Sequence, residues 1–429
     1  MELLARMSRF RPDSLTGESI MTERLLAPHE AAIAAAGVRV VLHCDVEGDV
    51  DETVLAQALD RLQECYPLLG GRIVTEAGNG PLVRIDATAP KPELNRGTDF
   101  DGEVSAPLAW DRTPLLRLTL LPASGGSRVV MTLPRAFVDA TCYLAVHERL
   151  WALYAALATG RPLPVERVEP VLAPALDEVL SARFTDGQLR EFVAERARLD
   201  AQAAPALLPA LAADNNGPGP DLSFGITTVE AGPDHCERLA QRARDTSLTL
   251  NALVSGVLLT SLRSVLPVPE GPVRMLCTTA VDMRRRLSPP LPAQVLQSAA
   301  TTTSVRLDID EHAHPVEVGQ ELNARLRADL DSGAAAMELA AFPYMLDQHP
   351  PTLVITNVGT IAGPDLPKEL RITNVRIAPL GHVPMLFAVV SRYRGRLAID
   401  LTYSRAWYTD TQIQELVDRV SVTLADAGR

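Results

Sequence analysis

Cysteine is scarce in this chain, and its spacing argues against two kinds of site. The five cysteines are odd in number and no two of them are spaced as C-x-x-C: Cys44, Cys65, Cys142, Cys236 and Cys277. A disulfide framework or a structural zinc site is therefore not expected, and no metal is assigned. The same pattern is typical of the reducing cytoplasm, which is the expected location.

Long apolar runs and an excess of basic charge are also lacking. The N-terminal segment has no apolar core of the kind that a secretory signal needs. No run of about 18 apolar residues predicts a membrane span. The formal net charge is -12, whereas binding to nucleic acid requires a basic surface. We therefore expect neither a membrane span nor a nucleic-acid partner.

The chain is nevertheless apolar enough to fold as a globular enzyme. Its 429 residues exceed one ordinary core, and 47% of them are hydrophobic against 22% charged. Over residues 201–221 the composition shifts to Ala, Pro, Asn and Gly, which is typical of an interdomain connection. The sequence thus predicts a first unit at 1–200, a connection at 201–221 and a second unit at 222–429.

Both units show the alternation of strands and helices that is typical of an α/β fold with mixed sheets. In the first unit, residues 37–48 alternate as a strand does, and apolar side chains recur at helical spacing within 49–71 and over 141–160. In the second unit, the patterns predict strands at 222–230, 273–284, 298–309 and 351–359, and helices at 233–245, 248–266, 315–333 and 409–428. A hairpin is predicted around Arg394-Gly395.

The segment TLPRAFVDATC, residues 132–142, joins a predicted strand to a predicted helix. Such junctions present side chains and backbone N–H groups to ligands. The segment holds one acid, Asp139, and one cation, Arg135, but no histidine. Arg135 stays protonated at any working pH, so it can bind an anion or stabilise an oxyanion but cannot act as a general base. Asp139 beside an arginine is more typical of a buried ion pair than of a base.

The order of elements resembles the condensation-domain superfamily, which includes chloramphenicol acetyltransferase. Within it, the chain is most similar to the polyketide-associated acyltransferases typified by phthiocerol/phthiodiolone dimycocerosyl transferase. The resemblance runs from about residue 24 onward and is carried by ALDRLQECYPLLGGRI, LTLNALVSGVLLTSL, TTAVDMRRRLSPPL, TNVGTIAGPDL and GRLAIDLTYSRAWY. It implies a V-shaped pair of chloramphenicol acetyltransferase-like lobes. A tunnel between them would admit an acyl thioester from one side and an acceptor from the other.

The active-site motif of that family is His-His-x-x-x-Asp-Gly, and PRAFVDA occupies the matching place. Pro134 and Arg135 stand at the two histidine positions, Asp139 at the Asp and Ala140 at the Gly. In the family the second histidine is the general base or positions the acceptor, and the Asp is mainly structural. The resemblance therefore assigns Asp139 to an ion pair with an arginine of the second unit, for which Arg284 is the first choice.

Other residues are candidates for the site. His382, on a predicted loop, is the candidate for the missing base. Phe137 and Cys142 are expected to contact substrate; Cys142 would be a nucleophile if a cation lowered its pKa, and otherwise a small buried hydrophobe. Asn357, in the predicted polar turn TNVGT, would line the tunnel or only reverse the chain. His29 is predicted at the surface.

These features predict an acyltransferase of natural-product (polyketide or peptide) or complex-lipid biosynthesis. It would move an acyl group from a carrier-protein or CoA thioester to a hydroxyl or amine, by a non-standard mechanism because the histidines are missing. The CoA or phosphopantetheine thioester would be a co-substrate; no tightly bound cofactor is expected, and a monomer is. Two alternatives stay open: a repurposed fold that cyclises or rearranges a biosynthetic intermediate, and a non-catalytic docking partner of a megasynthase.

Overall fold

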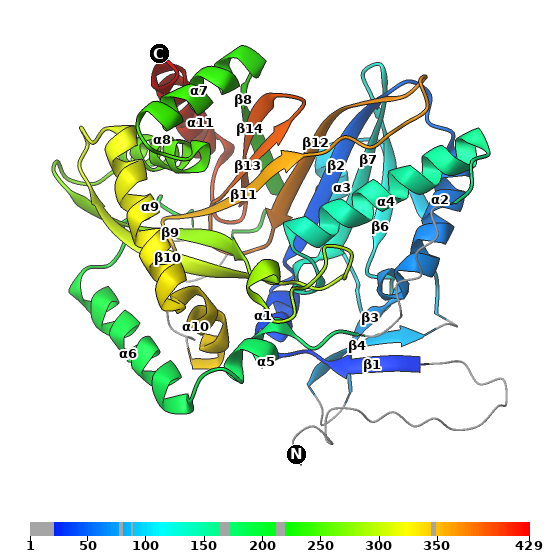
Figure 1. The fold of residues 1–429 in the computed structure, drawn as a ribbon, viewed down its shortest axis with the longest axis horizontal. Coiled ribbons are helices and arrows are strands. Elements are labelled where there is room, and N and C mark those ends of the chain that lie inside the picture. Colours follow the sequence, from blue (N-terminus) through cyan, green and yellow to red (C-terminus); the bar gives the residue numbers. More distant parts are fainter. Residues whose placement is uncertain (1–20, 77–79, 87–88, 164–171, 212–218, 345–348) are drawn as a thin grey trace.

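Two α/β lobes lie side by side in the computed structural model, and each is built on its own sheet (Figure 1). The structure describes residues 21–76, 80–86, 89–163, 172–211, 219–344 and 349–429. Parallel and antiparallel strand pairs occur in both sheets, so the predicted α/β class with mixed sheets is confirmed. The tunnel between the lobes stays a prediction.

The first sheet has five strands in the order β12-β2-β7-β6-β5. A smaller sheet beside it has the order β1-β4-β3. The strands of these two sheets are β1 (Met21–Leu25), β2 (Arg39–Glu47), β3 (Arg72–Thr75), β4 (Pro81–Asp86), β5 (Leu94–Arg96), β6 (Arg117–Ala123), β7 (Gly126–Pro134) and β12 (Arg371–Leu380). The helices of this lobe are α1 (Pro28–Ala35), α2 (Glu52–Cys65), η1 (Pro67–Gly70), α3 (Phe100–Ser105), η2 (Arg135–Phe137) and α4 (Ala140–Thr159).

The second sheet has six strands in the order β10-β9-β11-β13-β14-β8. They are β8 (Phe224–Ala231), β9 (Val273–Asp282), β10 (Ala300–Ile309), β11 (Leu353–Ile361), β13 (Phe387–Tyr393) and β14 (Arg396–Ser404). The helices that follow the first lobe are α5 (Leu176–Ser181), α6 (Asp186–Gln202), α7 (Pro233–Asp245), α8 (Leu250–Val265), η3 (Arg284–Arg286), α9 (Pro315–Ser332), α10 (Ala334–Ala340), η4 (Phe342–Tyr344) and α11 (Asp410–Ala427).

Helix and turn ends follow the local sequence. Asp51 begins α2 by accepting hydrogen bonds from the Thr53 and Val54 N–H groups, which otherwise lack partners in the first helical turn. Gly160 ends α4 in the left-handed conformation, with φ of 64°. Arg394 and Gly395 both have positive φ, as a two-residue hairpin turn requires. The hairpin predicted around Arg394-Gly395 is therefore confirmed.

The central strand β2 is buried on both faces, which the alternating pattern did not predict. Val40 and Leu42 belong to the core under α2 and α4. On the opposite face, Val41 packs in a separate cluster with Phe224 and Leu380. Because Phe224 starts β8 of the other lobe, this second face of β2 is covered by the neighbouring lobe. The edge where β2 begins and β7 ends therefore lies where the lobes meet.

One strand of the first sheet comes from the second half of the chain. β12 pairs antiparallel with β2, and Figure 1 shows it beside β2. The predicted division at residues 201–221 separates most strands, but β12 joins the first sheet, and α5 and α6, which precede the division, pack against α10 of the second lobe. The pairing shifts register between Ile372 and Asn374, which interrupts the alternation of apolar residues by which a strand is read from sequence. Residues 212–218 of the predicted connection lie outside the described residues.

Helix α8 packs unusually close to α9, and glycine makes the approach possible. A Cβ atom on Gly256 would lie 1.9 Å from the carbonyl oxygen of Pro315.

Helix α8 is also apolar around most of its circumference because it packs against α9, α11 and the sheet. Among the described residues no single helix is long and apolar enough to cross a membrane, although α7 and α8, bent by 99°, pass that test as a pair.

Candidate functional site

The turn that carries Arg135 is fixed where β7 passes into α4. The strand ends at Pro134, a short 3-10 turn follows over Arg135–Phe137, and α4 begins at Ala140. The Arg135 N–H donates to the carbonyl oxygen of Val38 at 2.9 Å. That bond extends the β2–β7 pairing by one step and holds the turn against the start of β2. The predicted junction between strand and helix is therefore confirmed.

Asp139 accepts hydrogen bonds from both lobes. Its Oδ1 accepts from the Cys142 N–H at 2.9 Å, which caps α4. Its Oδ2 accepts from the Ala299 N–H at 2.8 Å and from Arg284 Nη2 at 2.9 Å. The Asp139 and Arg284 side chains are only 5% and 2% exposed. The structure thus brings together the two residues that were predicted to pair, and the pair lies in the interior.

Arg284 is held on every side of its guanidinium group. Besides the carboxylate, it donates to the carbonyl oxygens of Pro292, Val295 and Gln297. A buried charge is tolerated only when its donors are satisfied in this way. Thr141 adds a further bond between the lobes, since its Oγ1 donates to Asp282 Oδ2 at 3.0 Å. The motif turn is therefore clamped to residues 282–299 of the second lobe.

Arg135 takes part in this clamp with one nitrogen only. Its half-buried side chain donates from Nη1 to the Val138 carbonyl oxygen at 2.9 Å and to Ser298 Oγ at 2.5 Å. Among the described residues, none accepts a hydrogen bond from Nη2 or Nε of Arg135. Burial lowers the pKa of the guanidinium, and the nearby Asp139 carboxylate opposes that effect. An arginine keeps its proton under such a shift, so a fixed cation with unused donors lies at the turn.

Cys142 is not placed as a nucleophile. Its side chain is 1% exposed, and its sulfur lies 3.5 Å from the Gln297 carbonyl oxygen. Burial raises the pKa of the thiol to about 12, with Asp139 as the next cause. A thiol with such a pKa stays protonated at neutral pH, and the thiolate is the nucleophilic form. The interpretation as a small buried hydrophobe is therefore supported, and substrate contact is not.

We expect Cys142 in the folded protein to resist iodoacetamide from pH 7 to pH 9, because the thiolate fraction stays negligible while the pKa is near 12. Mass spectrometry of digested protein would measure its labelling. Half-buried Cys65 serves as the internal comparison. Rapid alkylation of Cys142 in protein that remains folded would contradict this prediction.

Phe137 and Asn357 lie away from the position they were expected to occupy. Phe137 is 3% exposed and packs in the core of the first lobe, so the structure gives it a packing role in place of the predicted substrate contact. Asn357 is exposed in β11 and accepts from the Gly359 N–H at 2.9 Å. The predicted polar turn is wrong: β11 continues through it with a bulge, where Gly359 has φ of 80°.

His382 lies at the same end of the first sheet as the motif turn, but on a different strand. It follows β12, whereas Arg135 follows β7, and β2 runs between these strands. The ends of β7 and β12 are therefore two strand spacings apart, which is about 10 Å. The imidazole stacks on Phe224 with centroids 4.5 Å apart, and its Nδ1 lies 3.3 Å from Ser404 Oγ. Burial, and then Arg39, lowers its pKa. Its role as a base stays a prediction.

His29 is nearer the motif than its predicted surface position suggested. Helix α1, which carries it, packs against the turn η2. Its half-buried ring meets Phe342 edge-on with centroids 5.0 Å apart. Burial lowers the pKa of the imidazole to about 3, and the charge of Arg135 is the second cause. Sequence carried no signal for this proximity, because α1 and the motif are about a hundred residues apart and meet only in the fold.

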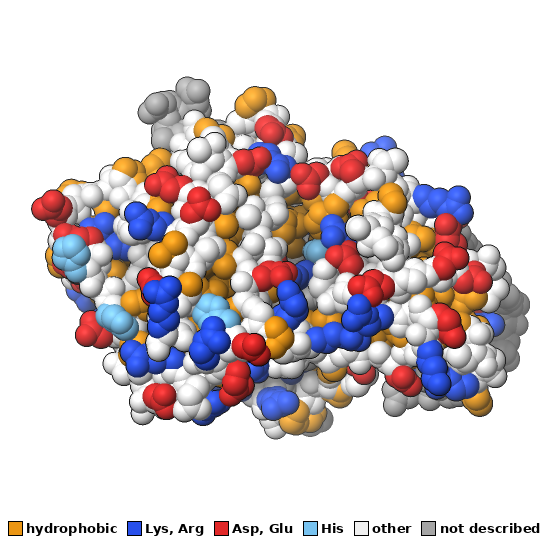
Figure 2. Space-filling model, turned by 90° about the horizontal axis from the view of Figure 1, so that it is seen from above, with side chains coloured by type: hydrophobic (Ala, Val, Ile, Leu, Met, Phe, Trp, Pro, Cys, Tyr) orange, Lys and Arg blue, Asp and Glu red, His pale blue; other side chains and the backbone are white. Residues whose placement is uncertain are grey.

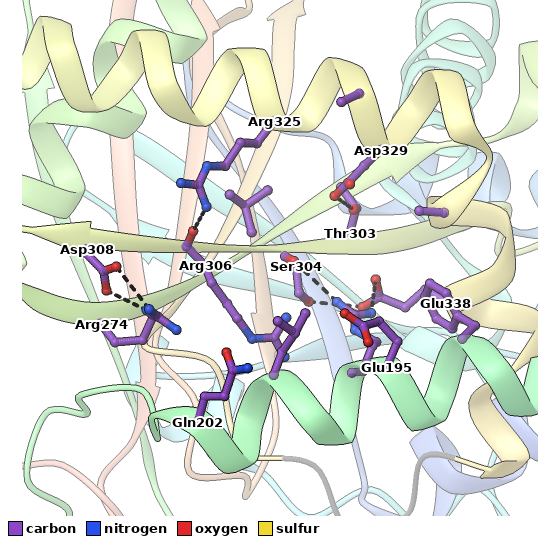
Figure 3. A pocket seen from close by; sticks show the side chains of 16 residues that line it. Glu195, Gln202, Arg274, Thr303, Ser304, Arg306, Asp308, Arg325, Asp329 and Glu338 are labelled. Carbon is purple, nitrogen blue, oxygen red and sulfur yellow. Dashed lines mark hydrogen bonds and ion pairs between the residues drawn. The ribbon is translucent and has the colours of Figure 1, made fainter.

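A cavity among the described residues lies elsewhere and does not resemble an active site. It has a volume of about 500 Å³ and is bounded by α6, α9 and β10 on the second lobe (Figure 3). Charged side chains that line it form ion pairs, among them Arg274 with Asp308 and Arg196 with Glu338. We therefore place the candidate site at the turn that carries Arg135.

Comparisons with known proteins show what the chain is similar to. Residues 220–402 match the family model described as phthiocerol/phthiodiolone dimycocerosyl transferase C-terminus. The phthiocerol/phthiodiolone dimycocerosyl transferase of Mycobacterium leprae is 23% identical over 396 residues, which cover 88% of this chain and 91% of that protein.

Solved structures share the whole fold. Polyketide synthase associated protein 5 of Mycobacterium tuberculosis superposes with a TM-score of 0.74 at 20% identity, covering 94% of this chain and 97% of that one. The first condensation domain of the CDA synthetase gives a TM-score of 0.74 at 16% identity, covering 95% and 96%. The resemblance to the condensation-domain superfamily and to its polyketide-associated acyltransferase branch is confirmed, and the comparisons support an acyltransferase enzyme.

Proposed function

We propose that this chain is a cytoplasmic acyltransferase of polyketide, peptide or complex-lipid biosynthesis that works at the turn carrying Arg135. It would transfer an acyl group from a carrier-protein or CoA thioester to a hydroxyl or amine. The observation that carries the proposal is the fixed guanidinium: Nη1 is anchored to Ser298 and Val138, and Nη2 and Nε are not used by the described residues. Relatives named as transferases support the reaction class.

The chemistry of acyl transfer explains why a cation is useful at this place. Attack on the thioester carbonyl turns its oxygen into an oxyanion, and a preorganised donor stabilises that charge more than it stabilises the ground state. Arg135 would be such a donor, since its position is set before substrate binds. Holding donor and acceptor together supplies several kcal/mol more. The clamp of Asp139 and Arg284 supports this role, because it fixes the turn with respect to both lobes.

The face drawn in Figure 2 has no large area that carries charge of one sign. Figure 2 shows acidic and basic side chains interspersed over the face drawn there. A carrier protein would therefore have to bind by a local patch, and a free CoA thioester is an equally suitable donor. We propose the thioester as a co-substrate that comes and goes with each turnover, with no resident cofactor in the reaction.

Thiol release measures the proposed reaction directly. The purified chain would be incubated with acyl-CoA and acyl-pantetheine thioesters of different chain lengths, with and without long-chain alcohols and amines. We expect free thiol to appear faster when an acceptor is present, together with an ester or amide found by mass spectrometry. Thiol release that stays at the background rate with every donor would contradict the proposal.

A further inference from the structure

Acyl transfer to a hydroxyl leaves a proton to be removed, and Arg135 cannot accept it. The acceptor loses its proton as its oxygen or nitrogen attacks the carbonyl, so a neutral base near the motif would raise the rate. At the family's histidine positions this chain has Pro134 and Arg135, neither of which is a base. A base must therefore come from another element that packs against the turn.

Helix α1 packs against that turn and carries a histidine in its first turn. His29 lies in the segment Pro28–Ala35, which contacts Arg135–Phe137. Its backbone N–H donates to Asp177 Oδ2 at 3.2 Å, and its ring rests edge-on against Phe342 at 5.0 Å. Backbone and ring are thus both held. The residue as a whole is half-buried.

The ring of His29 is also electrostatically close to Arg135. The positive charge of Arg135 lowers the pKa of His29 further than burial alone does, and the pKa is about 3. The imidazole is therefore neutral at pH 7, and the same two causes make it a weaker base than a free imidazole. The charged groups identified around it are Arg135 and Asp177; the latter is bonded to the backbone of His29.

Other histidines of the first lobe are already engaged. His147 is 2% exposed and accepts a hydrogen bond from Trp151 Nε1 at 3.0 Å. His43 is 6% exposed and packs on Phe100. By contrast, no hydrogen bond joins the ring of His29 to any residue in the described ranges.

We propose that His29 accepts the proton of the acceptor hydroxyl or amine in the acyl transfer. The inference rests on the proposed function. The acceptor oxygen would form a bond to the thioester carbonyl carbon while its proton passes to a ring nitrogen of His29, and Arg135 would stabilise the oxyanion. Collapse of the tetrahedral intermediate breaks the carbon–sulfur bond, and the imidazolium returns the proton to the leaving thiolate. The products are the ester or amide and the free thiol, and His29 is neutral again.

The test uses two variants that differ in what they remove. His29→Ala removes the ring, and His29→Phe keeps the aromatic contact with Phe342 but has no nitrogen. The exposed His312→Ala is the matched control. We expect both His29 variants to lower kcat by about 10- to 10²-fold with little change in KM, at or below the lower end of the range for a general base, because a pKa of about 3 makes the imidazole a weak base. We also expect added imidazole to restore part of the activity of His29→Ala but not of the control, which a purely structural role would not produce.

The outcomes separate this inference from the proposed function. If the wild-type chain transfers acyl groups and both His29 variants retain at least half of its kcat, the inference is overturned and the function stands. The inference is also overturned, and the function stands, if His29→Ala loses activity that imidazole does not restore while His29→Phe is fully active. If wild type shows no transfer with any thioester, both are overturned. Melting temperatures of the variants within a few degrees of wild type show that folding is not the cause.

Discussion

Replacing Asp139 by alanine is expected to destabilise the folded chain by about 3–5 kcal/mol, because it leaves the Arg284 charge buried without its counter-ion. Arg284 is 2% exposed and Asp139 5%, so water cannot replace the carboxylate without opening the interface between the lobes. The change also removes the acceptor for the Ala299 N–H and the cap of α4 at Cys142. Loss of activity should accompany the loss of stability.

Urea unfolding followed by circular dichroism would measure this effect. The control is Glu64→Ala, which removes the partner of Arg61 in an exposed pair and should change stability by less than about 1 kcal/mol. A double variant, Asp139→Ala with Arg284→Met, should lose less than the sum of the two single changes, because neither charge is then left alone. A loss below 1 kcal/mol for Asp139→Ala would show that the pair does not brace the turn.

Replacing Arg135 by alanine is expected to lower kcat/KM by about 10²–10³, the range found when one donor to a developing oxyanion is removed. Arg135→Lys should retain part of the activity, since it keeps the charge but not the fixed geometry of the guanidinium. Arg285→Ala is the matched control, because this neighbour of Arg284 is an exposed arginine. Steady-state thiol release at several thioester concentrations would give kcat and KM separately.

The same substitution removes the hydrogen bonds to Val138 and Ser298, so activity must be compared in folded protein. Circular dichroism and melting temperature of each variant provide that check. Activity of Arg135→Ala within about threefold of wild type would mean that the guanidinium only ties the lobes together. The motif turn would then be structural, and catalysis would lie elsewhere.

The sequence predicts the elements that carry strong local signals. Asp51 begins α2 through its side-chain carboxylate, and Gly160 ends α4 because glycine adopts positive φ readily. Arg394-Gly395 forms a turn with positive φ at both residues. Asp139 and Arg284 could be paired in advance because the resemblance provided both positions. Nothing in the local pattern of either residue alone identifies the other, since they are far apart in the chain.

What the sequence missed depends on contacts between distant segments. β12 was not predicted because a bulge interrupts the alternation of its apolar and polar residues. Its place in the first sheet depends on pairing with β2, which is far away in the sequence. Phe137 and Arg135 lie two residues apart in one short turn, which directs one side chain to the core and leaves the other half-exposed. His29 was predicted at the surface because its partners, Phe342 and Arg135, come from other parts of the chain.

The central claim is that Arg135 is a working replacement for the family's histidine and not a remnant of a lost site. The most direct test restores the family motif with Pro134→His, Arg135→His and Ala140→Gly and measures acyl transfer against wild type with the same thioester and acceptor. Our account predicts that transfer falls below the wild-type rate, because the fixed cation and its bond to Ser298 are lost. A rate that rises above wild type would contradict it and identify the site as decayed.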